Sequence, residues 1–230
     1  MHEIKDRLKE VKERIRKAAL ACGRDPLSVK LVAVSKTMPV EKIRCAIEAG
    51  VTILGENYVQ EARKKIDALS SYPVSWHFIG HLQTNKAKYA VRLFDLIHSV
   101  DSEKLAREID RQAKKANKIQ QVLIQVNIGK DPAKSGTAAE NTIRLLREIC
   151  HLENISVQGL MTMPPFFDDP EKVRPYFVAM SELRDQIRQE NIPNISMDEL
   201  SMGMTGDFEV AIECGATLVR IGTAIFGKRN

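Results

Sequence analysis

The stretch LVAVSKTMPVEKIRCAIEAGVTILGE, residues 31–56, contains the pattern that decides the fold. Its first run, Leu31–Ser35, is apolar and rich in β-branched residues, and its last run, Ile53–Glu56, is similar. Between them, Val40–Ala49 places apolar residues at helical spacing. A strand, a helix and a second strand in this order predict two parallel strands joined by a crossover helix.

The same alternation continues along the chain. Further short apolar runs predict strands at Trp76–Ile79, Leu96–Val100, Val122–Asn127, Val157–Met161, Glu199–Met202 and Leu218–Ile221. Stretches with helical period predict helices at Glu103–Ala116, Ala138–Cys150, Val173–Gln189 and Phe208–Cys214. About eight strands, each followed by a helix and none left over as an edge, favour a (β/α)₈ TIM-type barrel over an open doubly wound sheet.

The first residues predict one helix outside this repeat. Ile4, Leu8, Val11, Ile15 and Ala18 recur at steps of four and three, which line one face of a helix. We therefore expect an extra N-terminal helix over residues 1–22 and a barrel over residues 30–227. Because such a barrel needs roughly 200 residues, the whole chain, residues 1–230, is predicted to be a single domain.

Composition excludes several classes of protein. The 230 residues carry 35 Lys and Arg against 30 Asp and Glu, a modest excess interleaved with acidic residues, so we expect no nucleic-acid partner. The longest apolar stretches, at Gln120–Ile128 and Ala216–Phe226, are too short for a membrane helix, and the N-terminus lacks an apolar leader. We expect a cytoplasmic protein with no membrane association.

Metal chemistry is also not indicated. The four cysteines are far apart in the sequence and form no C-x-x-C pair. His77 and His81 have no third ligand at metal spacing, so we interpret them as core or rim histidines.

Lys36 is the first candidate for chemistry. It ends the first predicted strand, and the working residues of such barrels lie at the carboxyl ends of strands. Partial burial would lower the pKa of its amine and allow it to form a Schiff base with an aldehyde or ketone. The alternative is an ordinary solvated lysine at the end of a strand.

The segments after the seventh and eighth predicted strands resemble a phosphate cradle. Residues 201–207 and 220–224 both combine glycine with serine or threonine and lead into helical sequence. Backbone N–H groups and hydroxyls at a helix start bind phosphate, and this fold often binds phosphate after strands seven and eight. The candidate residues are Ser201, Gly203, Thr205, Gly222 and Thr223, although such clusters also mark ordinary turns.

Three further residues are candidates for contacts with a planar ligand. Arg220 lies two residues before Gly222 on an extended strand, so it shares the face of the cradle and can donate to a ring nitrogen or form a surface ion pair. Asn57 can bond a cofactor oxygen or cap the following helix. Met161 can pack on a ring or fill a gap in the core.

A reactive lysine, a phosphate cradle and an inward-facing arginine together describe a site for an aldehyde that carries phosphate. Pyridoxal 5′-phosphate (PLP) has these groups. A sugar-phosphate aldolase would also use the first two, and Arg220 is the residue that favours a pyridine ring.

Several segments resemble the pyridoxal phosphate homeostasis proteins of the YggS/PROSC family, whose barrel is similar to the N-terminal domain of alanine racemase. The matching segments are Ala33–Thr37, Gly55–Glu61, Trp76–Gly80, Gly159–Met161, Leu200–Met204 and Val219–Gly227. The resemblance implies that Lys36 holds PLP as an internal aldimine and that Asn57 and Arg220 contact its ring. It also implies a phosphate site made by three residues: Ser201, Gly222 and Thr223.

The resemblance also implies a role. Members of the family act in controlling vitamin B6 and amino-acid pools without an established catalytic turnover. We therefore predict a monomer that binds PLP reversibly in intracellular PLP homeostasis, with PLP-dependent apoenzymes as transient acceptors. The alternative is a PLP-dependent amino-acid racemase. Lys134, in the loop after the fifth predicted strand, is either a second amine that takes over PLP during release or a solvated lysine.

Overall fold

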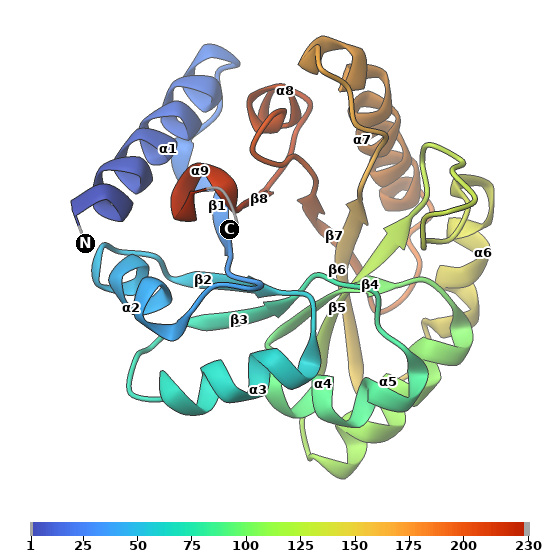
Figure 1. Ribbon diagram of the computed structural model, residues 1–230. Coiled ribbons are helices and arrows are strands. Elements are labelled where there is room, and N and C mark those ends of the chain that lie inside the picture. Colours follow the sequence, from blue (N-terminus) through green and yellow to red (C-terminus); the bar gives the residue numbers. More distant parts are fainter. Residues whose placement is uncertain (1, 228–230) are drawn as a thin grey trace.

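The computed structural model describes residues 2–227, and within them eight parallel strands form a closed barrel (Figure 1). Strands that follow one another in the chain are neighbours in the sheet. The first and last strands also pair, with Leu31 opposite Val219, and this pairing closes the barrel. The strands are β1 (Lys30–Val34), β2 (Ile53–Glu56), β3 (Ser75–Phe78), β4 (Leu96–Val100), β5 (Gln120–Val126), β6 (Ile155–Thr162), β7 (Ile195–Ser201) and β8 (Leu218–Ile221). The predicted barrel is confirmed.

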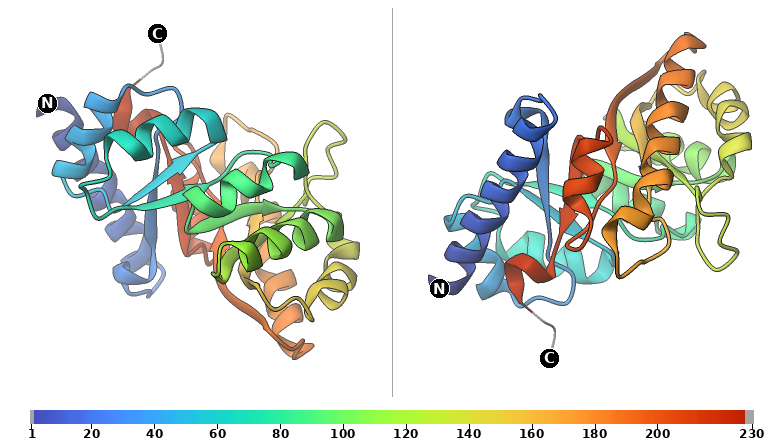
Figure 2. Two further views of the ribbon diagram at one scale, coloured as in Figure 1. Left: turned by 90° about the horizontal axis from the view of Figure 1, so that it is seen from below. Right: turned by 90° about the horizontal axis from the view of Figure 1, so that it is seen from above.

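Helices lie on the outside of the strands, as two further views show (Figure 2). They are α1 (His2–Ala21), α2 (Val40–Glu48), α3 (Val59–Ala68), α4 (Ala87–Leu93), α5 (Glu103–Lys115), α6 (Ala139–Ile149), α7 (Arg174–Gln189), α8 (Phe208–Glu213) and α9 (Thr223–Phe226). Short 3₁₀ turns occur at η1 (Pro26–Ser28), η2 (Thr84–Lys86) and η3 (Pro170–Val173). Among residues 2–227, each helix is too short or too polar to cross a membrane.

Helix α1 packs against the outside of the barrel, chiefly on α8, α9 and α2. Leu8 and Val11 are buried, and Ile4, Ile15 and Ala18 lie on the same buried face. The predicted apolar stripe of the opening helix is therefore covered within the chain, where it joins the first element of the fold to the last.

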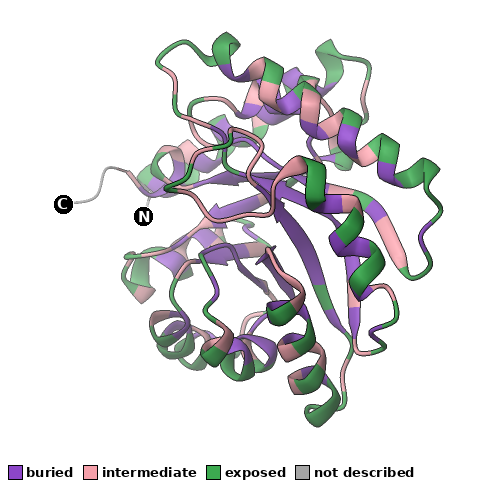
Figure 3. Ribbon diagram, turned by 90° about the vertical axis from the view of Figure 1, so that its right-hand side faces the viewer, coloured by how far each residue is buried: buried purple, intermediate pink, exposed green. Residues whose placement is uncertain are grey.

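The core consists of an outer layer between strands and helices and a small cluster inside the barrel. Figure 3 shows that the strands are mostly buried, whereas the outer faces of the helices are exposed. The inner cluster comprises Val32, Leu96, Leu123, Met161 and Leu218. Met161 therefore fills the barrel interior, as the gap-filling alternative for this residue predicted.

The strands on one side of the barrel begin earlier than their apolar runs suggest. Strand β7 begins at Ile195, four residues before the predicted start. Its first four residues include the polar residues Ser196 and Asp198. Strands β5 and β6 each begin two residues before the predicted start. Polar side chains at the amino-terminal mouth of the barrel interrupt the apolar pattern without interrupting the backbone hydrogen bonds.

Candidate functional site

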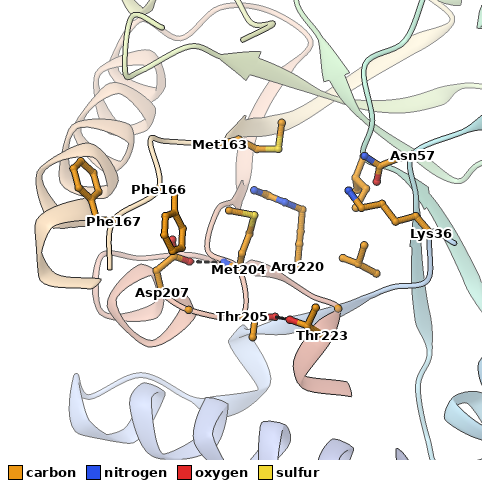
Figure 4. A pocket seen from close by; sticks show the side chains of 14 residues that line it. Lys36, Asn57, Met163, Phe166, Phe167, Met204, Thr205, Asp207, Arg220 and Thr223 are labelled. Atoms are coloured by element: carbon orange, nitrogen blue, oxygen red, sulfur yellow. Dashed lines mark hydrogen bonds between the residues drawn. The ribbon is translucent and has the colours of Figure 1, made fainter. Parts of the chain in front are cut away.

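A cavity of about 270 Å³ opens at the carboxyl ends of the strands (Figure 4). Its volume is near the lower end of the range for small-ligand sites. It is lined by Val34, Lys36, Asn57, Ile79, Met163, Phe166, Phe167, Met204, Thr205, Gly206, Asp207, Arg220, Gly222 and Thr223. This is the face of the barrel on which the sequence predicted the site.

The cavity brings together six of the nine residues predicted to bind a cofactor: Lys36, Asn57, Thr205, Arg220, Gly222 and Thr223. The other three are not among the described residues that line it. Met161 belongs to the barrel interior, Ser201 is fully buried beneath Arg220, and Gly203 forms a turn packed against α8.

Lys36 and Asn57 lie on the same side of the cavity (Figure 4). Lys36 follows β1 by two residues and is half-buried. The side-chain oxygen of Asn57, Oδ1, is buried and has no hydrogen-bond partner among the described residues. Helix α3 begins after Tyr58 with no side-chain cap, so Asn57 does not have the capping role that the sequence left open. Its buried carbonyl oxygen is available to accept a bond from a ligand.

Arg220 lies in the middle of the cavity and is 4% exposed. Its guanidinium donates to Ser201 Oγ at 2.6 Å and to the carbonyl oxygen of Thr162 at 2.7 Å. Burial lowers the pKa of Arg220 to about 10, opposed by the negative charge of Asp207, so the side chain stays cationic at neutral pH. The surface ion pair that the sequence allowed is excluded by this burial.

A chain of hydrogen bonds continues from Arg220 into the barrel. Ser201 Oγ is 3.0 Å from His98 Nδ1, and His98 Nε2 is 3.0 Å from His77 Nδ1. Burial lowers the pKa of His77 to about 4 and that of His98 well below its usual value, so both rings are neutral at pH 7. Because a guanidinium only donates, the Ser201 hydroxyl is free to donate to His98, which then donates to His77.

The floor of the cavity comes from the loops after β7 and β8. Thr223 Oγ1 donates to Thr205 Oγ1 at 3.2 Å, so the two hydroxyls lie side by side (Figure 4). Gly222 precedes α9, and amides in the first turn of a helix have no acceptor within that helix. Asp207 Oδ1 accepts from the backbone N–H of Met204 at 2.6 Å and fixes the β7 loop. Burial raises the pKa of the Asp207 carboxyl.

The remaining wall is a loop after β6, in which the sequence suggested Met163 as a ring contact but did not suggest the two phenylalanines. Met163, Phe166 and Phe167 line the cavity from this side. Phe166 is 79% exposed, so an aromatic side chain lies open at the mouth. The signal in the sequence was the run Pro164 to Phe167, two prolines followed by two aromatic residues in a loop.

Lys134 fixes this loop from the neighbouring β5 loop. Its Nζ donates to the carbonyl oxygens of Pro164 at 2.8 Å and Met163 at 3.3 Å. Lys134 therefore lies on the rim, as predicted, and it is bonded to the wall of the cavity.

No group of three or more metal-binding side chains occurs among residues 2–227.

Comparison with known proteins agrees with this architecture. The family "Alanine racemase, N-terminal domain" matches residues 7–230. A pyridoxal phosphate homeostasis protein of Aquifex aeolicus is 50% identical over 225 residues, which cover 98% of each chain. A second one, from Pasteurella multocida, is 42% identical over 229 residues and covers 99% of this chain and 98% of its own.

Among solved structures, PipY of Synechococcus elongatus with PLP bound superposes with a TM-score of 0.85 at 35% identity. The match covers 97% of this chain and 100% of PipY. The similarity of this chain to PipY, in sequence and in structure, thus extends over nearly the full length of both proteins. The chain belongs to the pyridoxal phosphate homeostasis protein family, within the larger group of proteins that share the alanine racemase N-terminal domain.

Proposed function

We propose that this chain binds PLP in the cavity and holds it reversibly through Lys36, as a carrier that takes part in PLP homeostasis. The structure of PipY with PLP bound and the name of the Aquifex relative support the choice of ligand. When bound, PLP would supply an aldehyde that can condense with the Lys36 amine, and the hydroxyls of Thr205 and Thr223 would hold its phosphate.

The arrangement of the cavity carries this proposal. Lys36, the hydroxyls of Thr205 and Thr223 and the cation of Arg220 all line the same cavity, with Arg220 near its centre (Figure 4). PLP carries its aldehyde and its phosphate-bearing arm on neighbouring ring carbons, and the cavity offers an amine for the first and a pair of hydroxyls for the second. The unpartnered Oδ1 of Asn57 offers one more polar contact beside Lys36.

Arg220 favours a carrier over a catalyst. A guanidinium beside a pyridine nitrogen disfavours protonation of that nitrogen, and an unprotonated ring is a weaker electron sink for carbanion chemistry. Ser201 and Thr162 hold the guanidinium in place, so it cannot turn away without leaving buried acceptors unpaired. We propose little or no turnover of amino acids.

The second candidate is a PLP-dependent amino-acid racemase, which the match to the alanine racemase N-terminal domain favours. It uses the same lysine and differs in turnover. Incubation of the loaded protein with L-alanine and L-serine, followed by chiral analysis, separates the two. We expect no D-amino acid above a protein-free control, and sustained multiple turnovers would establish the racemase.

Transfer of PLP to apoenzymes is the biological step we propose for the carrier. Phe166 is open to solvent at the mouth, so a recipient can approach the same side of the barrel from which PLP leaves. The step is tested by mixing the loaded protein with a PLP-dependent apoenzyme and following recovery of the activity of that enzyme. Recovery faster than PLP loss into buffer supports direct transfer.

Binding itself is tested by calorimetric titration with PLP, with pyridoxal and with inorganic phosphate. We expect PLP to bind much more tightly than either fragment, since the cavity offers an amine for the aldehyde and hydroxyls for the phosphate. Hydrogen bonds to a charged phosphate contribute about 1.5 to 3 kcal/mol each. Equal affinity for PLP and pyridoxal would show that the hydroxyls of Thr205 and Thr223 do not bind phosphate.

A further inference from the structure

Strand β2 and helix α3 carry three charged residues that the binding site does not account for. Glu56 ends β2, and Glu61 and Lys65 lie four residues apart on one face of α3. None of the three is among the described residues that line the cavity. The Glu56 and Lys65 side chains are 0% and 5% exposed, yet a buried ion pair is by itself weak evidence for a stabilising role.

The Lys65 ammonium joins these charges to the backbone just before Lys36. Its Nζ donates to Glu56 Oε1 at 2.7 Å, to Glu61 Oε1 at 2.6 Å and to the carbonyl oxygen of Ser35 at 2.6 Å. An ammonium has three N–H groups, so these bonds use all of them. The Ser35 hydroxyl also donates to Glu56 Oε1, at 2.6 Å.

The same cluster holds the backbone just after Lys36. The N–H of Thr37 donates to Glu61 Oε1 at 2.6 Å. Thr37 has φ of 64°, a left-handed conformation that is unusual for a β-branched residue. A single group of three side chains therefore bonds both neighbours of Lys36 and maintains a turn that threonine does not adopt readily.

We propose that Glu56, Glu61 and Lys65 are positioning residues, which hold the Ser35–Thr37 turn so that the Lys36 amine enters the cavity ready to condense with an aldehyde. This inference rests on the proposed function. In the condensation, the Lys36 nitrogen forms a bond to the aldehyde carbon, and the aldehyde oxygen leaves as water with the two amine hydrogens. A fixed backbone speeds this step because the amine spends more time in the reactive orientation.

The first experiment compares Lys65→Met with Lys64→Met, a matched change of the neighbouring exposed lysine. Each protein is mixed with PLP, reduced with borohydride after set times and digested, and the pyridoxyl group on Lys36 is quantified by mass spectrometry. We expect Lys65→Met to slow labelling of Lys36 by about tenfold to a hundredfold, and Lys64→Met to keep the wild-type rate. Equal rates in the two variants would overturn the proposal.

Because Lys65→Met leaves two carboxylates without their cation and can impair folding, Glu61→Ala gives an independent test. The Glu61 side chain is 29% exposed, and its removal frees the Thr37 amide without opening the core. Exposed Glu41 on α2 provides the control Glu41→Ala. We expect slower labelling of Lys36 in Glu61→Ala only, with the urea midpoint of unfolding close to that of the control.

A further readout separates positioning from general stability and needs no PLP. Amide hydrogen exchange at Thr37, measured by NMR, should be faster in Glu61→Ala than in the wild type, while amides in β4 and β5 keep their protection. Unchanged Thr37 exchange, or equal acceleration of exchange throughout the barrel, would overturn the positioning role. If wild-type Lys36 is never labelled, the proposed function fails, whereas the Thr37 exchange still decides whether the cluster holds the turn.

Discussion

Ser201 determines how Arg220 is presented to the cavity. Its hydroxyl oxygen accepts from the guanidinium on one side and bonds His98 on the other, and it is fully buried. The sequence correctly placed Ser201 at the end of a strand, and its contact with phosphate stays a prediction. The side chain points into the barrel toward a histidine 103 positions away in the sequence, a contact that local patterns do not contain.

At the same scale, Lys134 makes a testable contribution to retention of PLP. Its two bonds to carbonyl oxygens tie down the loop that carries Met163 and Phe166. Lys134→Met removes these bonds and should make PLP leave faster, by about tenfold for a loss of about 1.4 kcal/mol. The rate is measured by trapping released PLP with an excess of apoenzyme. Lys130→Met, which changes an exposed lysine of the same loop, should release PLP at the wild-type rate. Slower release from Lys134→Met would contradict the tethering role and support a role for the amine in transfer.

At the scale of elements, the loops after β7 and β8 act as one unit. Thr205 and Thr223 come from different loops and meet through one hydrogen bond. Thr223→Val keeps the shape of the side chain and removes its hydroxyl. We expect this variant to bind PLP about tenfold to a hundredfold more weakly, and to bind pyridoxal as the wild type does. Calorimetry with both ligands measures this, and an equal loss for both would indicate a general disturbance of the cavity.

The strands and the loops proposed to bind phosphate could largely be predicted from the sequence. All eight strands were found because buried parallel strands are nearly continuous apolar runs, although the run predicted for β7 covers only the last three residues of that strand. The glycine and threonine segments after β7 and β8 were found because helix starts and turns have their own residue preferences. Phe166 in the β6 loop was missed because loops lack the periodicity that marks helices and strands. The cluster of Glu56, Glu61 and Lys65 was missed because its role depends on three-dimensional contacts with the turn around Lys36.

At the scale of the whole molecule, the line from His77 through His98 to Ser201 and Arg220 connects the barrel interior to the cavity. Both histidines are neutral when folded because burial lowers the pKa values, that of His77 to about 4. In the unfolded chain they bind protons below about pH 6.5, so the unfolded state binds more protons there than the native state. Stability contributed by these residues is therefore present at neutral pH and lost as the pH falls toward about 4.

This linkage predicts a difference between variants. His77→Asn should remove about 2 kcal/mol of the decrease in unfolding free energy between about pH 7 and pH 5. His151→Asn changes an exposed histidine and serves as the control. Urea unfolding at both pH values measures the effect. The same pH dependence in His77→Asn as in the wild type would show that His77 binds a proton as readily in the folded protein as in the unfolded chain, which contradicts the lowered pKa.

The central claim is that Lys36 is the residue that holds PLP, in a cavity at the mouth of the barrel where the loops after β7 and β8 bind the phosphate. The most direct measurement is borohydride reduction of the wild-type protein with one equivalent of PLP, followed by peptide mapping of the pyridoxyl group. We predict that nearly all of the label is on Lys36 and that excess inorganic phosphate slows its appearance. Label found chiefly on Lys134 or spread over exposed lysines, or no stable label at all, would contradict the claim.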